Sequence, residues 1–188
     1  QIAQFKQDQV SQLSTQQIRA LDTQKVQAMG ANQVRGLTST QMAALTTDQL
    51  QALTTAQATA LSNTQINALS STQLASLQTA DLAAVSATAV SGLSTATIKA
   101  LTSDQVAALG ATQIRSLSTA QLNAMDAGDL SKMSTAQITQ LTATQINGLS
   151  TAQLDAMTTT QFSALDARQV QSLTTAQMAS LSTDKIQA

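Results

Sequence analysis

The chain lacks several residue types on which enzymatic chemistry commonly depends. Its 188 residues include no cysteine, histidine, proline, tryptophan or tyrosine, and only two phenylalanines. Without cysteine or histidine there are no disulfides, no thiolate or imidazole ligands for a metal, and no imidazole to activate a hydroxyl nucleophile. The sequence therefore predicts no catalytic residues, no metal site and no cofactor, and we expect that the protein is not an enzyme.

Charge and long apolar runs are scarce as well. Charged residues make up 10% of the chain and the net charge is −1, whereas roughly 25% charged residues is typical of soluble domains. No apolar run approaches the roughly 18 residues of a membrane span, and Gln1 opens the chain without a charged leader or an apolar signal core. We expect neither a nucleic-acid partner nor a membrane span. The polar surface must come from Ser, Thr, Gln and Asn, a composition more usual outside cells.

What the chain does have is an eight-residue repeat. From Phe5 to Ala188 it divides into 23 consecutive octads without an insertion or deletion, and residues 1–4 match the second half of another octad. Positions one and six are apolar, position two is mostly Ser, Thr or Asp, position five is mostly Gln, and position eight is usually small. The sequence therefore predicts one continuous array over residues 1–188.

An eight-residue rule restricts the backbone conformation. In a single long helix, eight residues overshoot two turns by about 80°, so the apolar positions would spiral around the rod. In a plain strand, positions one and six would point to opposite faces because they are five residues apart. Neither structure gathers both apolar positions on one buried face.

A short helix in every octad satisfies the pattern. Ser118 followed by Gln121 forms a capping box, in which the hydroxyl accepts from a free backbone N–H and the Gln side chain reaches back to the cap residue. Leu117 and Leu122 flank this pair as a hydrophobic staple. Isolated helices below about 12 to 15 residues are marginal in water, so each octad needs its neighbours. We expect an all-α solenoid of very short capped helices; the alternative is a β-solenoid built on Thr and Gln ladders.

The polar residues have structural interpretations within this scheme. Asp22, Asp126 and Asp166 occupy the cap position. Four further aspartates are expected in the first helical turn, where the positive end of the helix favours them: Asp8, Asp48, Asp104 and Asp184. The basic residues are too dispersed to form a patch: Arg19, Arg35, Arg115, Arg168, Lys25, Lys99 and Lys132.

Three glycines and three threonines leave alternatives open. Gly36, Gly92 and Gly148 recur at position eight in every seventh octad, which indicates a segmental duplication, a closer packing of coils, or chance. Thr38, Thr46 and Thr54 are expected to be helix caps. They would form a hydroxyl row for ice or glycan only if the coils stacked in flat register.

Stretches such as Leu45 to Ala52 (LTTDQLQA) and Leu173 to Ser180 (LTTAQMAS) carry a family resemblance that covers the whole chain. They resemble the LTxxQ(I/L/V)xA octapeptide tracts of large secreted or surface adhesin-like proteins of bacteria. The resemblance implies an extracellular or cell-surface location, and it transfers no functional residue.

We therefore expect a structural stalk or filament that supports adhesion, biofilm or fibre assembly, with an ice- or carbohydrate-binding array using Thr and Gln faces as the alternative. The chain begins within an octad, and neither end resembles the polar cap of a solenoid. The sequence thus predicts an excerpt of a longer array, or self-association into fibres.

Overall fold

The computed structural model describes residues 2–187, and they are helical in every octad. Each α-helix begins at the third octad position, and within the described residues there is no strand. The all-α prediction is confirmed and the β-solenoid alternative is wrong. The elements are η1 (Ile2–Gln4), α1 (Gln7–Ser11), α2 (Thr15–Arg19), α3 (Thr23–Gln27), α4 (Ala31–Gly36), α5 (Ser39–Ala44), α6 (Thr47–Gln51), α7 (Thr55–Ala58), α8 (Asn63–Asn67), α9 (Ser71–Ser76), α10 (Thr79–Ala84), α11 (Ala87–Ser91), α12 (Thr95–Lys99), α13 (Ser103–Ala108), α14 (Ala111–Ser116), α15 (Thr119–Ala124), α16 (Ala127–Lys132), α17 (Thr135–Ile138), α18 (Ala143–Asn147), α19 (Thr151–Ala156), α20 (Thr159–Ser163), α21 (Ala167–Gln171), α22 (Thr175–Ser180) and α23 (Thr183–Gln187).

The residue at position two starts each helix because its backbone is extended. Ser118, for example, has φ −74° and ψ 160°, and its side chain accepts a hydrogen bond from the backbone N–H of Gln121. A residue with this backbone cannot continue the preceding helix. Position two therefore caps the next helix, as the capping pattern predicts, while the preceding helix has already ended by position eight; α14, for example, ends at Ser116, and its C-cap Leu117 is extended.

The two apolar positions form the core, as predicted. At position six the side chains from Val10 to Leu154 are almost completely buried, with Ile66 and Leu130 at 0% exposure. Position one is buried too from Met29 to Met157. Because most of these side chains are Leu, Ile, Val or Met, the core is narrow.

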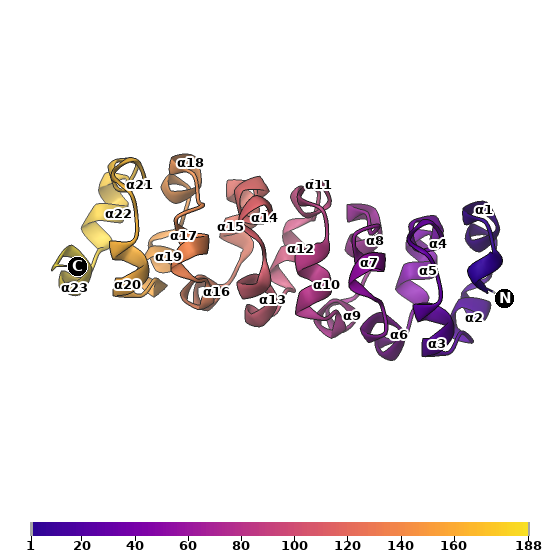
Figure 1. Cartoon of the computed structure of the whole chain (residues 1–188). Helices are drawn as coiled ribbons and strands as arrows, with labels where there is room; N and C mark the ends of the chain where they lie inside the picture. The colour runs from indigo at the N-terminus through magenta and orange to yellow at the C-terminus, as the bar shows by residue number, and fades with distance from the viewer. Residues whose placement is uncertain (1, 188) are drawn as a thin grey trace. The chain divides into compact units, whose positions relative to one another are not determined.

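The helices group into two compact units, Gln1–Leu101 and Thr102–Ala188. Within each unit, the helices that pack together are three octads apart, such as α1 with α4, α2 with α5 and α16 with α19 (Figure 1). Consecutive helices follow one another around a coil, and helices three further along lie against them. Each unit is a solenoid with between three and four octads per turn.

The three regularly spaced glycines lie where neighbouring coils come close. A Cβ atom on Gly36 would lie 2.6 Å from the backbone oxygen of Gln7, and one on Gly92 would lie 2.8 Å from Cγ of Asn63. In the second unit, a Cβ on Gly148 would lie 2.9 Å from Cβ of Thr119. Real Cβ contacts are longer than this, so of the three interpretations of these glycines the structure supports close packing.

Candidate functional site

The glutamine at position five completes a capping box in most octads. In α5, the backbone N–H of Gln41 donates to Oγ1 of Thr38 at 3.2 Å, and the backbone N–H of Thr38 donates to Oε1 of Gln41 at 2.8 Å. The same pair of bonds recurs in α6 between Thr46 and Gln49. These bonds satisfy backbone N–H groups that the first turn of a helix leaves free.

The amide nitrogen of the same glutamine reaches a different coil. Nε2 of Gln41 donates to the backbone oxygens of Val10 and Leu13, which lie 31 and 28 residues earlier. The glutamines that make this pair of bonds at 2.6 to 3.1 Å include Gln41, Gln49, Gln57, Gln65, Gln145, Gln153, Gln161, Gln169 and Gln177. We call the row of position-five residues in each unit the glutamine seam.

Each seam glutamine has two roles. Oε1 accepts from the cap residue at the start of the local helix, while Nε2 donates to two carbonyl groups at the end of a helix in the previous turn. Of the two that Gln41 contacts, the carbonyl of Val10 also accepts from the backbone N–H of Leu13, whereas the carbonyl of Leu13 depends on the glutamine. Seam glutamines such as Gln49 and Gln105 are 1 to 2% exposed. A hydrogen bond of this kind contributes about 0.5 to 1.5 kcal/mol, and leaving a buried partner unpaired costs about 1 to 3 kcal/mol.

Two octads replace the seam glutamine with aspartate. Asp81 Oδ1 accepts from the hydroxyl of Thr55 at 3.0 Å, and Asp129 Oδ1 accepts from the hydroxyl of Ser103 at 2.6 Å. Asp129 also keeps the cap, because its Oδ2 accepts from the backbone N–H of Asp126 at 3.0 Å. Oδ2 of Asp81 is buried without a partner. Burial raises the pKa of Asp81, and the hydrogen bond from Thr55 lowers it by a smaller amount.

Two other octads keep the links with different side chains. Where Thr97 stands at position five, Asn67 of the previous turn accepts from the backbone N–H of Ser94 at 2.9 Å and from the hydroxyl of Thr97 at 2.7 Å. Where Lys185 stands there, its buried ammonium group contacts the backbone oxygen and the carboxylate of Asp155. The contact with the previous turn is therefore retained although the residue type changes.

The structure places the predicted threonines at helix caps. Thr38, Thr46 and Thr54 each accept from the glutamine N–H three residues later, at 3.2 to 3.3 Å. They belong to α5, α6 and α7, which follow one another around the coil, whereas helices that pack together are three octads apart. The capping interpretation is confirmed, and these three residues do not stack as a hydroxyl row.

All three aspartates predicted at the cap position are N-caps, and two of them make the side-chain cap bond. Asp22 accepts from the backbone N–H of Lys25 and Asp166 from that of Gln169, both at 2.8 Å. Hydrogen bonds from the side chain and backbone of Lys25 lower the pKa of Asp22. Asp126 is the N-cap of α16, as predicted, although its carboxylate accepts no cap hydrogen bond. Oδ2 of Asp129 accepts from the backbone N–H of Asp126, which is the bond that Oε1 of the position-five glutamine makes in other octads.

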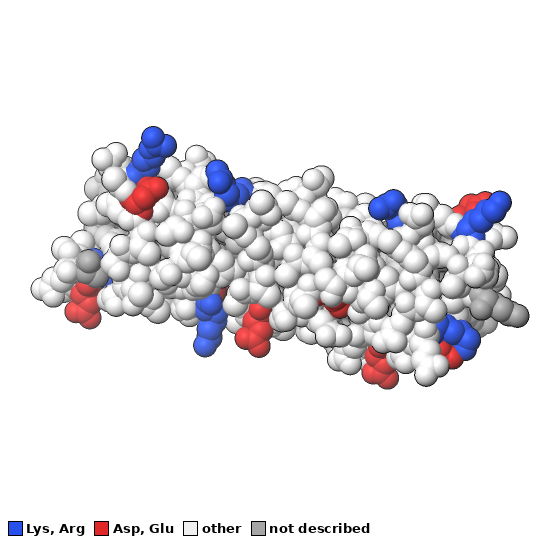
Figure 2. All heavy atoms as spheres, viewed as in Figure 1, with Lys and Arg blue, Asp and Glu red and all other residues white. Residues whose placement is uncertain are grey.

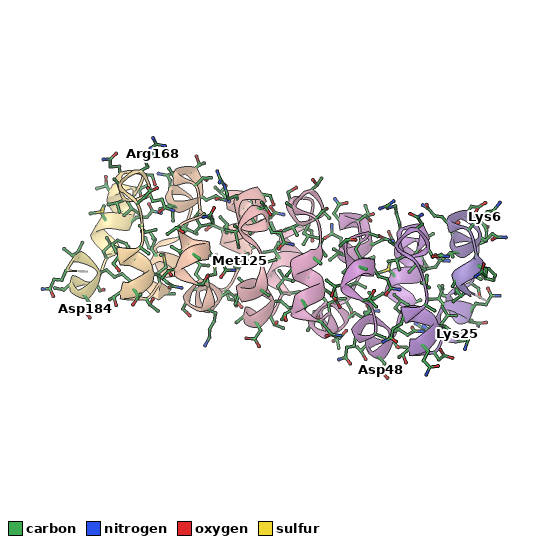
Figure 3. All side chains as sticks on the ribbon, viewed as in Figure 1. Lys6, Lys25, Asp48, Met125, Arg168 and Asp184 are labelled. Carbon is green, nitrogen blue, oxygen red and sulfur yellow. The ribbon has the colours of Figure 1, made fainter. Side chains whose placement is uncertain are left out.

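The remaining charged residues lie where the sequence places them. The four other aspartates, Asp8, Asp48, Asp104 and Asp184, are in the first turns of their helices. On the face shown in Figure 2, basic and acidic side chains are interspersed on a mostly uncharged surface. Figure 3 shows Lys6, Lys25, Asp48, Arg168 and Asp184 extending outward from the ribbon.

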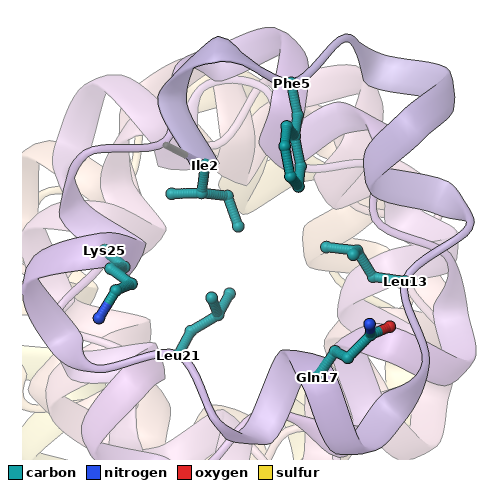
Figure 4. Close-up of a pocket in the computed structure, with 6 residues that line it drawn as sticks. All are labelled: Ile2, Phe5, Leu13, Gln17, Leu21 and Lys25. Carbon is teal, nitrogen blue, oxygen red and sulfur yellow. The ribbon is translucent and has the colours of Figure 1, made fainter.

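An apolar opening of about 340 Å³ lies inside the first coil. Ile2, Phe5, Leu13 and Leu21 point into it, and Gln17 and Lys25 complete its lining (Figure 4). Phe5 is 36% exposed, whereas Leu37 and Leu45 at the same octad position are 5% exposed. The octad core is therefore open to solvent at this coil.

Residues 2–187 contain neither a cluster of metal-ligating side chains nor a membrane-spanning helix. No group of three or more Asp, Glu, His or Cys residues among them is arranged to hold a metal ion. No helix in this part of the chain has the length and apolar character needed to cross a membrane. The two features that recur from coil to coil are the glutamine seam and the polar outer surface of the helices that it holds together.

The structure thus belongs to the class of helical repeat solenoids. The family model described as ALTTAQ repeat matches six overlapping segments, which together span residues 10–111 and 123–183. The chain belongs to the ALTTAQ repeat family. No curated protein matches it significantly.

Proposed function

We propose that the chain is a structural segment of a bacterial extracellular protein, a stalk or filament in which continuous length is itself the function. The observation that carries the proposal is the glutamine seam. Within each unit it ties each turn to the previous one through buried hydrogen bonds. Stability then accumulates turn by turn, and an array of this kind can lengthen without a new core design.

The surface supports an extracellular role. It is rich in hydroxyl and amide groups and poor in charge, and the family resemblance of the octads is to tracts in secreted or surface adhesin-like proteins. Adhesion and assembly of a biofilm or fibre are the roles that a long neutral stalk would support.

The proposed partner is more of the same octad, added end to end. Val170, Met178 and Ile186 at position six are 40 to 59% exposed, although this position is almost completely buried through most of the array. A further coil of octads would bury these side chains and gain roughly 25 cal/mol for each Å² of apolar surface removed from water.

Electron microscopy and sedimentation of the purified chain would test assembly. Elongated particles that lengthen with concentration are expected, and Ile186→Lys should shorten them, whereas Gln187→Lys, at an exposed polar neighbour, should not. Monomers at all concentrations would reject self-association. A thermal hysteresis assay addresses the ice-binding alternative, since a purely structural stalk should give no signal.

A further inference from the structure

Two surface grooves of the same construction occur in the chain, one in each unit. The first has a volume of about 380 Å³ and the second about 320 Å³. Their lining residues correspond one to one with a shift of ten octads, so Arg35, Thr59 and Ser86 match Arg115, Thr139 and Asp166. Both volumes fall within the range of small-ligand pockets, about 300 to 1,000 Å³.

The grooves open where a helix ends early. α7 and α17 have four residues each, and the other α-helices of the described chain have five or six. Thr59 and Thr139 follow them, and these are the only threonines at octad position seven. Their hydroxyls donate to the backbone oxygens of Ala56 and Ala136 at 2.7 and 3.0 Å. Ser131 makes the same bond to Gly128 in α16, which has six residues, so this bond does not by itself end a helix.

The arginine of each groove is free to bind a ligand. Arg19, at the same octad position, donates from Nε to the backbone oxygen of Ala44 at 3.1 Å. The side chain of Arg35 meets only Asn32, at 3.5 Å, among the described residues. The guanidinium of Arg115 has no partner in the described part of the chain. Both arginines are exposed, so a ligand would not have to displace an internal contact.

Each groove has a net positive charge in a chain whose net charge is −1. The first contains Arg35 and no acidic lining residue. The second contains Arg115, Arg168 and Asp166, and the carboxylate of Asp166 already accepts from the backbone N–H of Gln169. An anionic group is therefore the natural partner of each guanidinium, whose planar fork matches a carboxylate or sulfate with two parallel hydrogen bonds.

The rest of each lining indicates a ligand rich in hydroxyl groups. In the first groove the polar side chains beside the arginine are Thr59, Ser62, Asn63, Ser86 and Thr88. In the second they are Thr139, Gln140 and Thr142 together with the charged residues. Gln169 also lines this groove, but its amide is buried and bonded in the glutamine seam. We propose that each groove binds one acidic sugar residue of a polysaccharide, with the guanidinium on the carboxylate or sulfate and the neutral polar groups on the hydroxyls. The proposal does not depend on the structural role proposed above.

Isothermal titration of the full chain with short oligosaccharides would test this. The probes are a uronate oligomer, a sulfated oligomer, a neutral dextran oligomer and a polyphosphate of similar length. We expect two sites per chain for at least one acidic oligosaccharide. Binding to only the uronate or only the sulfated probe would identify the anionic group, and binding to both would show that either fits.

The variants assign the sites. Arg35→Gln and Arg115→Gln should each remove one site or weaken it about tenfold or more, as expected for a lost hydrogen bond to a charged group, and the double variant should remove both. Arg19→Gln is the matched control, because it removes the same charge at the same octad position outside the grooves. Circular dichroism checks that each variant is folded.

Several results would overturn the proposal. These are no binding of either acidic oligosaccharide, equal binding of neutral dextran or polyphosphate, and a loss in Arg19→Gln as large as in the groove variants. Thr59→Ala provides a second test in folded protein. Removing the hydroxyl takes one polar group out of the lining of the first groove, so binding there should weaken while the second site persists.

Discussion

Replacing one seam glutamine by methionine should destabilise the solenoid by about 2 to 4 kcal/mol. Gln49 is 2% exposed, and its Nε2 donates to the backbone oxygens of Ile18 and Leu21 at 2.8 and 2.6 Å. Methionine has nearly the same length and shape but cannot donate. Ile18 keeps a bond from the N–H of Leu21, so the main loss is a half-buried Leu21 oxygen without a partner, about 1 to 3 kcal/mol. Loss of the cap bond from Thr46 adds about 1 kcal/mol.

The same helix contains the control. Gln51 is exposed and makes no seam bond through its side chain, so Gln51→Met should change stability by less than about 0.5 kcal/mol. Urea unfolding followed by circular dichroism gives both values, and hydrogen exchange should show the loss of protection concentrated in α2 and α6. Equal effects of the two substitutions would refute the seam as a source of stability.

Gln49→Glu separates the two roles of the side chain. A capping box accepts Glu as readily as Gln. If the side chain of Gln49 acted only in the cap, this substitution would therefore change the free energy of unfolding little. The seam requires a donor, and an ionised carboxylate facing two carbonyl oxygens would repel them. At neutral pH we therefore expect Gln49→Glu to be at least as destabilising as Gln49→Met, and wild-type stability in this variant would show that only the cap matters.

Four further substitutions test other features by the same unfolding measurement. Ala89→Gln should stabilise the chain by about 1 to 2 kcal/mol, because the amide of the new glutamine side chain could donate to the backbone oxygen of Leu61 in the previous turn. No gain in the free energy of unfolding would show that the seam bond does not form at this coil. Burial raises the pKa of Asp81, so its neutral form contributes fully to the free energy of unfolding below the ordinary value of 3.8, and this contribution is lost as pH rises through the folded-state pKa. Asp81→Asn should reduce this loss of stability with rising pH. Identical pH profiles of stability for the two proteins would contradict the prediction. Gly36→Ala should destabilise because its Cβ would lie 2.6 Å from a backbone oxygen, whereas Gly128→Ala, with nothing within 4 Å, should stabilise by about 0.5 to 1 kcal/mol.

The local structure follows from the sequence because its causes lie within one octad. Ser118 and Gln121 are three residues apart, and Leu117 and Leu122 flank them, so capping and staple chemistry fix where the helix begins. Asp126 keeps the cap position without a side-chain cap bond, and Asp129 accepts from its backbone N–H as glutamine does in other octads.

The pitch of the coil does not follow from the octad rule. Every octad carries the same apolar positions, so the core pattern contains no information about which octads meet. That information lies in the second hydrogen-bonding group of Gln41 and its equivalents, whose targets are 28 and 31 residues away. A signal for it was present in the composition: all ten acidic residues are aspartate, although Glu would serve a capping box as well as Gln. Most octads use Gln there and none uses Glu, so the composition favours an amide donor at this position, with Asp81 and Asp129 as exceptions that accept from the previous turn instead.

The seam also gives a physical reason for the regular spacing of the glycines. A separation of 28 residues per turn is about three and a half octads, so the same octad position returns to the same face only after two turns, which is seven octads. In the first unit Gly36 and Gly92 have this spacing, and each closely approaches a residue of the previous turn, Gln7 and Asn63 respectively. A glycine that allows close contact with the previous turn at one coil can therefore recur on the same face two turns later.

The absence of insertions and deletions follows from the same geometry. A seam glutamine such as Gln41 bonds to two residues that lie 28 and 31 positions earlier in the chain, so several such bonds span any point in the interior of a unit. Removing one residue from α8, for example, would put the capping residues of that octad out of phase with the eight-residue repeat. It would also shift the amide of Gln73 and the carboxylate of Asp81 relative to their partners before α8, Leu45 and Thr55. A surface loop tolerates a changed length because no distant bond depends on it. Here each octad sets the register of the next turn, which makes the eight-residue length itself a constraint on the whole unit.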